Sequence, residues 1–407
     1  MQEKYVNCKI VVLHIENIPL PKGYEKIPVL YNISPAEIQG FLETNITETN
    51  AEKIHILEWR HSLNYYREKY VNILSQVVDY IKRLDAGART TSVFGKRWVR
   101  NFFRNLNNVN KSLLYRQADV PVIITGSGPG LEQALPVIKE VQDTCLIIAA
   151  SSSVMALSNS GVKADIVIST DGGNWALHHL YHSKSGIPAL AVNLCAALPS
   201  QYADTPLLLM NDGSFWQSII LHELELPSVL IPQKGTVTAS AVELAMLLSK
   251  NNVYLAGLDF SFNDIRTHVK PYSFDNILFG KSSRFTPFYN ECYTRSSLIS
   301  HGGSMDIYST WFKTQLDSWP KKIFSINESS LFQTGSPLDI KNRKKKDLCF
   351  KTISVNGDTN IFCKRGVSVL LDALTKNEFS DNLKNELLPL LGQELENEIK
   401  KMAKGFI

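Results

Sequence analysis

Glycines, hydroxyl residues and single acidic or histidine residues follow several apolar runs in this sequence of 407 residues. In VIITGSGPGLEQAL, four apolar or β-branched residues lead into Gly126, Ser127, Gly128, Pro129 and Gly130, and a helical pattern follows. Glycines let a backbone approach a ligand closely, and proline suits a first helical turn, so free N–H groups and the helix dipole would face an anion. A turn built only for tight packing would show the same spacing.

The residues after this loop exclude two common nucleotide sites. A P-loop requires a lysine and a hydroxyl residue after its last glycine, whereas Leu131 and Glu132 stand here. A dinucleotide site has an acidic residue after the second strand, whereas IIAASSSV ends in hydroxyl residues, among them Ser151 and Ser152. We therefore do not expect NAD.

Two further stretches offer groups for an anion or a sugar. In ISTDGGNW, the Asp171 carboxylate beside Gly172 suits a ribose hydroxyl, a sugar or a metal, and equally a turn or helix cap. In QKGTVTASAVELAML, Gly235, Thr236 and Thr238 precede an apolar-periodic helix. That helix start suits an anion, and an ordinary threonine cap explains it equally well.

Titratable side chains occur in two more stretches, further along the sequence. YLAGLDFSFND ends a strand with Asp259, and His268 and Tyr272 come shortly after it. His301 stands two glycines before Ser304, an expected N-cap. A helix N-terminus favours neutral imidazole, the form that a general base requires, although a single histidine is more often structural.

An alternation of short apolar runs and helical patterns from residue 119 to about 330 would position these groups. The runs are nearly continuous in apolar residues, as expected for strands covered on both faces, so we predict an α/β fold with a Rossmann-like, doubly wound, mostly parallel sheet. The predicted strands are 121–125, 145–150, 165–170, 188–193, 206–210, 253–258 and 322–326, and the predicted helices are 131–142, 153–160, 174–183, 238–249 and 305–318.

The flanking regions have other patterns. Residues 1–118 read as a small α/β segment, with a short helix capped at Ser34, followed by a helical region with one long helix. Within the central domain, 119–335, the aromatic-rich segment 271–300 reads as a long loop that serves as a lid. Residues 336–407 are predicted to be a mostly helical region, with a short strand pair and two helices within 348–407.

Composition restricts the class of protein. The net charge of +4 permits an anionic small ligand and does not suggest a nucleic-acid binder. The six cysteines form no CxxC pair, which favours reduced thiols over a disulfide framework or a zinc site. No run is long enough for a membrane span, and the N-terminus lacks the pattern of a signal peptide. We therefore expect a cytoplasmic protein.

Together these stretches resemble the motility accessory factor (Maf) family, which is regarded as a group of flagellin glycosyltransferases that use nonulosonic acids. The resemblance rests on GSGPGL, the strand-end serines, STDGG, KGTVTASAVELAMLLSKNNVYLAGLDFSF with RTHV, and YSTWFKTQLDSWPKKIFSINESSLFQTGS, over about residues 119–335. A helical N-terminal region is also typical of the family.

The same blocks are similar, more distantly, to bacterial sialyltransferases with a GT-A-like fold. Their GxGPSL loop, YLSGIDF, YAFD and histidine-containing helix start correspond here to GSGPGL, YLAGLDF, YSFD with Tyr272, and SHGGSMD with His301. The resemblance implies that His301 is the general base, that Tyr272 assists the departing phosphate and that no metal is needed. Gly130 replaces a serine of the family pattern, and Ser261 replaces a tyrosine.

The resemblance implies inverting, metal-independent transfer of a sialic-acid-like sugar from a CMP donor to a protein hydroxyl, such as Ser or Thr of flagellin, without a cofactor. The implied contacts to the nucleotide sugar are the loop 126–130, Ser151, Ser152, Asp171, Gly172, Gly235, Thr236, Thr238, Asp259 and His268. One alternative is a magnesium-dependent enzyme like the archaeal pterin diphosphokinases, with Asp171 and Asp259 as metal ligands. Another is a non-catalytic flagellin assembly protein.

Overall fold

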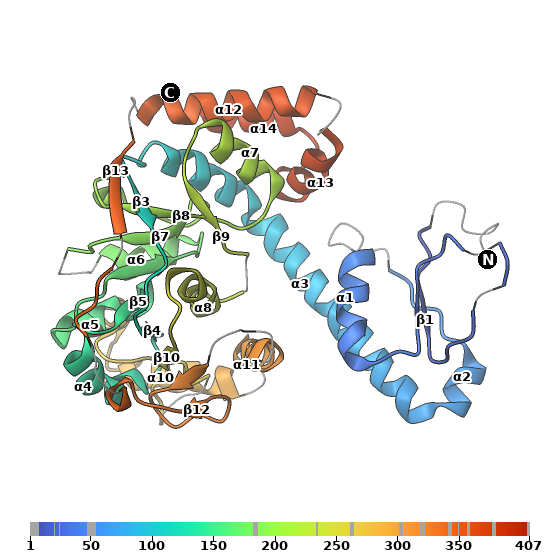
Figure 1. The fold of residues 1–407 in the computed structure, drawn as a ribbon, viewed down its shortest axis with the longest axis horizontal. Coiled ribbons are helices and arrows are strands. Elements are labelled where there is room, and N and C mark those ends of the chain that lie inside the picture. Colours follow the sequence, from blue (N-terminus) through green and yellow to red (C-terminus); the bar gives the residue numbers. More distant parts are fainter. Residues whose placement is uncertain are drawn as a thin grey trace. The chain divides into compact units, whose positions relative to one another are not determined.

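The computed structural model describes residues 8–19, 21–23, 25–46, 54–181, 186–232, 235–260, 264–300, 304–316, 319, 322–340, 344–348, 350–355, 359–376 and 380–404 (Figure 1). The chain divides into two compact units. The first comprises Met1–Lys96 with Leu388–Gly392, and the second comprises Arg97–Leu387 with Gln393–Ile407. The boundary falls inside the long helix α3 (Arg67–Leu106).

The first unit is a small α/β assembly. Strands β1 (Val12–His14) and β2 (Val29–Tyr31) pair in parallel, and helices α1 (Pro35–Asn45) and α2 (Arg60–Tyr65) precede α3. The core contains Ile33, Ile38 and Leu42 together with Val77 and Tyr80 of α3. The predicted short helix after Ser34 and the predicted long helix are both confirmed.

The described residues of the second unit form a sheet of 11 strands in the order β12-β11-β10-β4-β5-β6-β7-β8-β3-β13, with β9 paired to β8. All neighbours pair in parallel except β13 and β3, which are antiparallel. The strands are β3 (Lys111–Tyr115), β4 (Val122–Thr125), β5 (Leu146–Ala150), β6 (Ile166–Ser169), β7 (Leu190–Asn193), β8 (Leu207–Asn211), β9 (Ser228–Leu230), β10 (Val253–Ala256), β11 (Ile323–Ser325), β12 (Gln333–Thr334) and β13 (Phe350–Ser354).

The predicted α/β fold with a mostly parallel sheet is confirmed, and each of the seven predicted strands is present. Side chains alternate between the two faces of a strand. Val122 and Ile124 of β4 share a core with Val242 and Leu244 of α8 (Val237–Leu248), whereas Ile123 points to the other face. Both faces are therefore covered, and the central strands are apolar throughout.

The order of strands reverses direction at β4, since β5 lies on one side of it and β10 on the other. In open parallel sheets, ligands bind at such a reversal, outside the carboxyl ends of the strands. The glycine-rich loop follows β4 here, and the turn 257–260 follows β10. Helix α4 (Leu131–Val141) begins directly after the glycine-rich loop.

The expectation of a long loop over 271–300 is wrong. The segment contains α9 (Asp275–Lys281) and α10 (Phe288–Ser300). The rings of Phe279 and Phe288 stack with centroids 4.3 Å apart at 7°, which joins the two helices. Phe279 and Phe288 therefore hold a helix pair together, and the role of the segment as a lid stays a prediction.

The C-terminal residues also differ from expectation. In place of a local strand pair, β13 pairs with the distant β3, and three helices follow it: α12 (Thr359–Thr375), α13 (Ser380–Leu391) and α14 (Leu395–Lys404). Helix α12 packs on α7 (Phe215–Glu223) and on α14, and Figure 1 shows α12 and α14 side by side. No helix in the described part of the chain is long and apolar enough to cross a membrane.

Candidate functional site

The glycine-rich loop is joined to the turn after β10 through backbone hydrogen bonds. The Gly126 N–H donates to the Ala256 carbonyl at 2.8 Å, and the Gly128 N–H donates to the Gly257 carbonyl at 2.9 Å. A Cβ atom on Gly126 would lie 2.5 Å from the Gly257 oxygen. Real Cβ atoms do not come this close to a carbonyl oxygen, so glycine is required here for the packing of two backbones.

The Asp259 carboxylate lies inside this loop. The Gly130 N–H donates to Asp259 Oδ2 at 2.8 Å, and a Cβ atom on Gly128 would lie 2.2 Å from the same oxygen. Burial raises the pKa of Asp259, and the hydrogen bond from Gly130 opposes that effect. Asn327, which follows β11, donates to the Gly130 carbonyl at 2.7 Å. The N–H groups of Gly126, Gly128 and Gly130 are thus committed within the chain, which favours the packing interpretation of these glycines.

The start of α4 holds the segment that carries two predicted site residues. The Val269 N–H donates to the Ser127 carbonyl at 2.9 Å, and the Lys270 N–H donates to Glu132 Oε1 at 3.1 Å. Arg266 also binds the Glu132 carboxylate, at 3.1 Å. The segment between Arg266 and Lys270 is therefore fixed beside the first turn of α4, at the carboxyl edge of the sheet.

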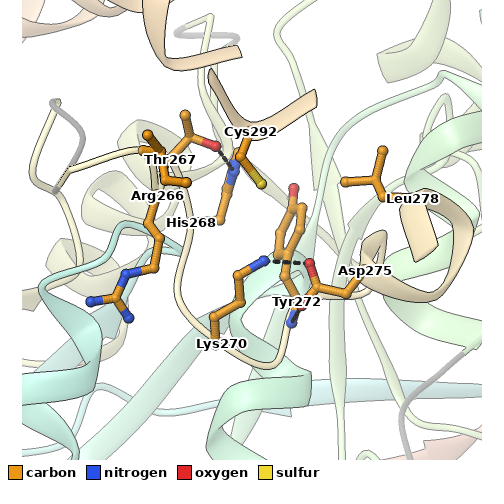
Figure 2. A pocket seen from close by; sticks show the side chains of 9 residues that line it. Arg266, Thr267, His268, Lys270, Tyr272, Asp275, Leu278 and Cys292 are labelled. Carbon is orange, nitrogen blue, oxygen red and sulfur yellow. Dashed lines mark hydrogen bonds and ion pairs between the residues drawn. The ribbon is translucent and has the colours of Figure 1, made fainter. Parts of the chain in front are cut away.

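Tyr272 stands in a cluster of rings at this edge. Its ring stacks on His268 with centroids 4.1 Å apart at 16°. His179 and Phe274 each lie 5.5 Å from it. Thr267 Oγ1 lies 2.8 Å from His268 Nδ1 and fixes the imidazole that faces Tyr272, as Figure 2 shows. The structure thus brings the predicted residues His268 and Tyr272 into direct contact.

The sequence analysis missed His179, which lies on α6 (Leu177–Tyr181). Its Nδ1 lies 2.5 Å from Ser273 Oγ, so it links α6 to the segment after β10. Burial, with a smaller effect from neighbouring His178, lowers the pKa of His179 to about 4. The imidazole is therefore neutral near pH 7. The available signal was the histidine pair in ALHHLY, shortly after ISTDGGNW.

A small pocket opens beside Tyr272. Lys270 Nζ pairs with Asp275 Oδ1 at 2.5 Å, and the Tyr272 N–H donates to Asp275 Oδ2 at 3.0 Å. Figure 2 shows Cys292 of α10 on one side and Arg266 pointing away from the Tyr272 ring. The space between the lining residues has a volume of about 20 Å³, enough for one or two water molecules.

Asp171 and Gly172 follow β6 at the same edge. Asp171 is exposed, and its Oδ1 accepts from the Gly173 N–H at 2.7 Å, which fits the turn interpretation. A Cβ atom on Gly172 would lie 2.2 Å from the Trp98 ring, so this glycine serves packing against α3. The Asp171 carboxylate is nevertheless accessible to a ligand at the carboxyl edge.

The serines after β5 form a short 3-10 turn. Ser151 is buried and Ser152 is half-buried. Ser153, which was not predicted, lies 2.8 Å from the Thr125 hydroxyl and donates to the Ala150 carbonyl at 2.8 Å. Its hydroxyl therefore ties the end of β5 to the end of β4.

Thr236 is the N-cap of α8, since its Oγ1 accepts from the Ala239 N–H at 3.0 Å. Thr238 Oγ1 lies 3.3 Å from Thr236 Oγ1, and Gly235 has a positive φ of 76°. Because α8 leads into the amino end of β10, its own N-terminus faces the carboxyl edge. The cap interpretation therefore fits Thr236.

His301 and Ser261 lie outside the described residues, so the predicted general base stays a prediction. Helix α11 (Ser304–Gln315) begins where the sequence placed a helix start. Within the described ranges, no three His, Cys, Asp or Glu side chains are grouped closely enough to hold a metal ion.

Comparisons with known proteins find a family model that matches part of the chain and a solved structure with a similar fold. Residues 96–264 match the model of the family described as 6-hydroxymethylpterin diphosphokinase MptE-like. An uncharacterized protein of Treponema pallidum (strain Nichols) is 25% identical over 291 residues, which are 71% of this chain and 64% of that protein. A second uncharacterized protein of the same organism is 23% identical over 249 residues, covering 56% of this chain and 41% of its own length.

A solved structure of the MAf glycosyltransferase from Magnetospirillum magneticum AMB-1 has the same fold. The TM-score is 0.54 at 12% identity, and the match covers 95% of this chain and 65% of that one. The chain thus spans just under two thirds of the length of the Treponema protein with 25% identity and of the solved glycosyltransferase.

Proposed function

We propose that this protein is a glycosyltransferase that moves a nonulosonic, sialic-acid-like sugar from a CMP donor to a protein hydroxyl, such as Ser or Thr of flagellin. The observation that carries the proposal is the His268–Tyr272 stack at the carboxyl edge, beside the start of α4. The stack supports the proposal because it lies at the edge of the sheet where ligands bind in folds of this kind. The fold itself matches that of a Maf glycosyltransferase over 95% of the chain.

In the proposed reaction, the bond between sugar C2 and the phosphate oxygen of CMP breaks through an oxocarbenium-like state. The electron pair of that bond stays on the phosphate, and the Tyr272 hydroxyl donates a hydrogen bond to it. The acceptor oxygen attacks C2 from the opposite face, so the configuration inverts. His301 takes the acceptor proton as general base.

The other predicted residues would hold the donor. The loop 126–130, with Ser151 and Ser152, forms the floor of the CMP site, and the α8 N-terminus with Thr236 and Thr238 offers donors to the phosphate. Helix N-termini stabilise negative charge, which supports a reaction that needs no metal. Asp171, next to Gly172, accepts hydrogen bonds from ribose or sugar hydroxyls. Asp259 keeps the loop in shape through Gly130.

The match to the MptE-like family supports a second candidate, a magnesium-dependent pterin diphosphokinase. It would use Asp171 and Asp259 as metal ligands. These residues follow β6 and β10, which are three strand spacings apart, or about 14 Å. One Mg²⁺ requires oxygen ligands at about 2 Å, so direct shared coordination would need a rearrangement of both turns. This spacing favours the glycosyltransferase.

A ligand screen separates the two candidates. Thermal unfolding would be followed with CMP, UDP, GDP and ATP, each with magnesium and with EDTA. We expect CMP to raise the unfolding temperature by the same amount with magnesium and with EDTA, because a ligand that binds only the folded state stabilises it. Stabilisation by ATP that requires magnesium, together with ATP turnover on a hydroxymethylpterin, would establish the diphosphokinase instead.

A transfer assay tests the roles of the residues. CMP release from CMP-N-acetylneuraminic acid would be measured with and without flagellin. Tyr272→Phe keeps the ring stack and loses the hydroxyl, so we expect the rate to fall by about 10- to 100-fold with unchanged stability. The matched control is Tyr289→Phe on α10, whose tyrosine is 70% exposed. Wild-type rates in Tyr272→Phe would refute the role of the hydroxyl.

His301→Ala should lower transfer by about 10²- to 10⁴-fold, the usual contribution of a general base. Added imidazole is expected to restore part of the rate. If the wild type binds CMP but transfers no sugar to flagellin, the proposed enzymatic activity is refuted. That result would favour an assembly protein.

A further inference from the structure

Trp175, which follows β6 at the carboxyl edge, is 60% exposed although other rings surround it. Its ring centroid lies 5.5 Å from His178 and 6.0 Å from Phe274. His178 and Phe274 are themselves 5.7 Å apart. These two neighbours hold the indole in place, and most of its surface is nevertheless open to solvent. An indole that served only the core would be covered.

A lysine from another element reaches the same indole. Lys281 ends α9, is exposed, and places Nζ 6.0 Å from the centroid of the Trp175 ring. Cations are attracted to the face of an aromatic ring at about this distance. The attraction keeps the ammonium beside the indole, while its N–H donors remain accessible to a ligand.

A series of neighbouring rings connects the Trp175 indole to the proposed reaction site. Tyr272 and Phe274 have centroids 5.5 Å apart, and Phe274 and Trp175 are 6.0 Å apart. Two ring-to-ring steps therefore connect the hydroxyl proposed to bind the leaving phosphate with the exposed indole. A sugar attached to that phosphate would extend over a distance of this order.

We propose that Trp175 and Lys281 form the subsite for the carboxylated sugar of the donor, an inference that rests on the proposed function. The indole would pack against the apolar C–H face of the sugar ring, and the ammonium would pair with the sugar carboxylate. Asp171, four residues before Trp175, would accept from sugar hydroxyls and repel the carboxylate, which directs it toward Lys281. A neutral hexose would gain only the indole contact.

Titration calorimetry with CMP and with CMP-N-acetylneuraminic acid tests the subsite. In the wild type we expect the sugar nucleotide to bind more tightly than CMP. Trp175→Ala should lower the affinity for the sugar nucleotide by about five- to tenfold, and Lys281→Met should lower it by about threefold. The affinity for CMP should stay unchanged in both variants. Lys281→Arg keeps the charge and should retain most of the affinity.

Two variants serve as matched controls. Trp59→Ala removes an indole that is 67% exposed in the other unit. Lys163→Met removes an exposed lysine at the amino end of β6, the opposite end from Trp175. Both should bind the two ligands as the wild type does.

The outcomes separate this inference from the proposed function. A wild type that binds neither CMP nor the sugar nucleotide refutes the proposed function, and the subsite with it. A wild type that prefers the sugar nucleotide, together with Trp175→Ala and Lys281→Met variants that keep the full preference, refutes the subsite alone. Equal loss of CMP and sugar-nucleotide affinity in both variants also refutes it, because the residues would then serve the nucleotide.

Discussion

Where the loop after β4 meets the turn after β10, the contacts join backbone atoms and one carboxylate, whereas around Tyr272 they join side-chain rings. The backbones of Gly126 and Gly257 pack directly against each other, and the Asp259 carboxylate lies inside the loop. In the second region, by contrast, the Tyr272 ring contacts the rings of His268 and His179.

The difference teaches where chemistry can reside at this edge. Backbone contacts in the first region leave little freedom to exchange residues, so substitutions there act first on folding. Ring contacts depend on the shape of the ring, so Tyr272→Phe can keep the stack on His268 while it removes a functional group. Three predictions test this comparison, beginning with the largest effect.

Gly126→Ala should destabilise the protein by about 3 kcal/mol or more, because the new Cβ atom would lie 2.5 Å from the Gly257 carbonyl oxygen and neither backbone can move away easily. Urea unfolding followed by circular dichroism measures this free energy. Gly280→Ala is the control, since its Cβ atom would meet nothing within 4 Å in α9, and alanine favours a helix by about 1 kcal/mol. Equal stabilities for the two variants would contradict the packing role of the loop.

His179 should make the stability of the ring cluster depend on pH. Its pKa is about 4 in the folded state, against 6.5 for a free histidine. Between these values the unfolded state binds more protons, so stability rises with pH through this window and is fully present above pH 6.5. The shift corresponds to about 3 kcal/mol at most.

The measurement is the difference in unfolding free energy between wild type and His179→Gln from pH 4 to pH 7. Because burial raises the pKa values of Asp165 and Asp259, their contributions have the opposite sign, and the difference cancels them. His222→Gln, at an exposed position on α7, is the control. A difference that stays constant with pH would show that His179 titrates normally.

Gly130→Ala should cost less than Gly126→Ala, about 1–2 kcal/mol. Its Cβ atom would lie 2.3 Å from Asp259 Oδ1, and that carboxylate can rotate away at the expense of the Gly130 hydrogen bond. In an Asp259→Ala background the cost should fall close to zero, so a double-mutant cycle should give a coupling of about 1 kcal/mol or more. Additive effects would place the strain elsewhere in the loop.

Much of the central fold was predictable because its signals are local. The buried runs around Ile123, Ile147 and Val167 are continuous in apolar residues, and each lies in a strand. The helix start at Thr236 was visible as a threonine before an apolar-periodic segment. Such patterns depend on neighbours within a few residues, so they survive without knowledge of the tertiary structure.

The errors came from long-range partners. The segment 271–300 reads as a loop because the Phe279–Phe288 stack that joins its helices is not a periodic signal. Strand β13 lacked a local partner and pairs with β3, more than 200 residues earlier in the chain. His179 was missed because its importance comes from Ser273, 94 residues away.

By itself the sequence determined the α/β class, the positions of seven strands of the central sheet and the presence of polar and titratable residues after several of them. Only the tertiary structure decided that Asp259 fills the glycine-rich loop and that His179, His268 and Tyr272 meet. The physical reason is that propensity and periodicity act over a few residues, whereas strand order places distant segments together. Side-chain contacts across that order follow from the packing of the whole sheet.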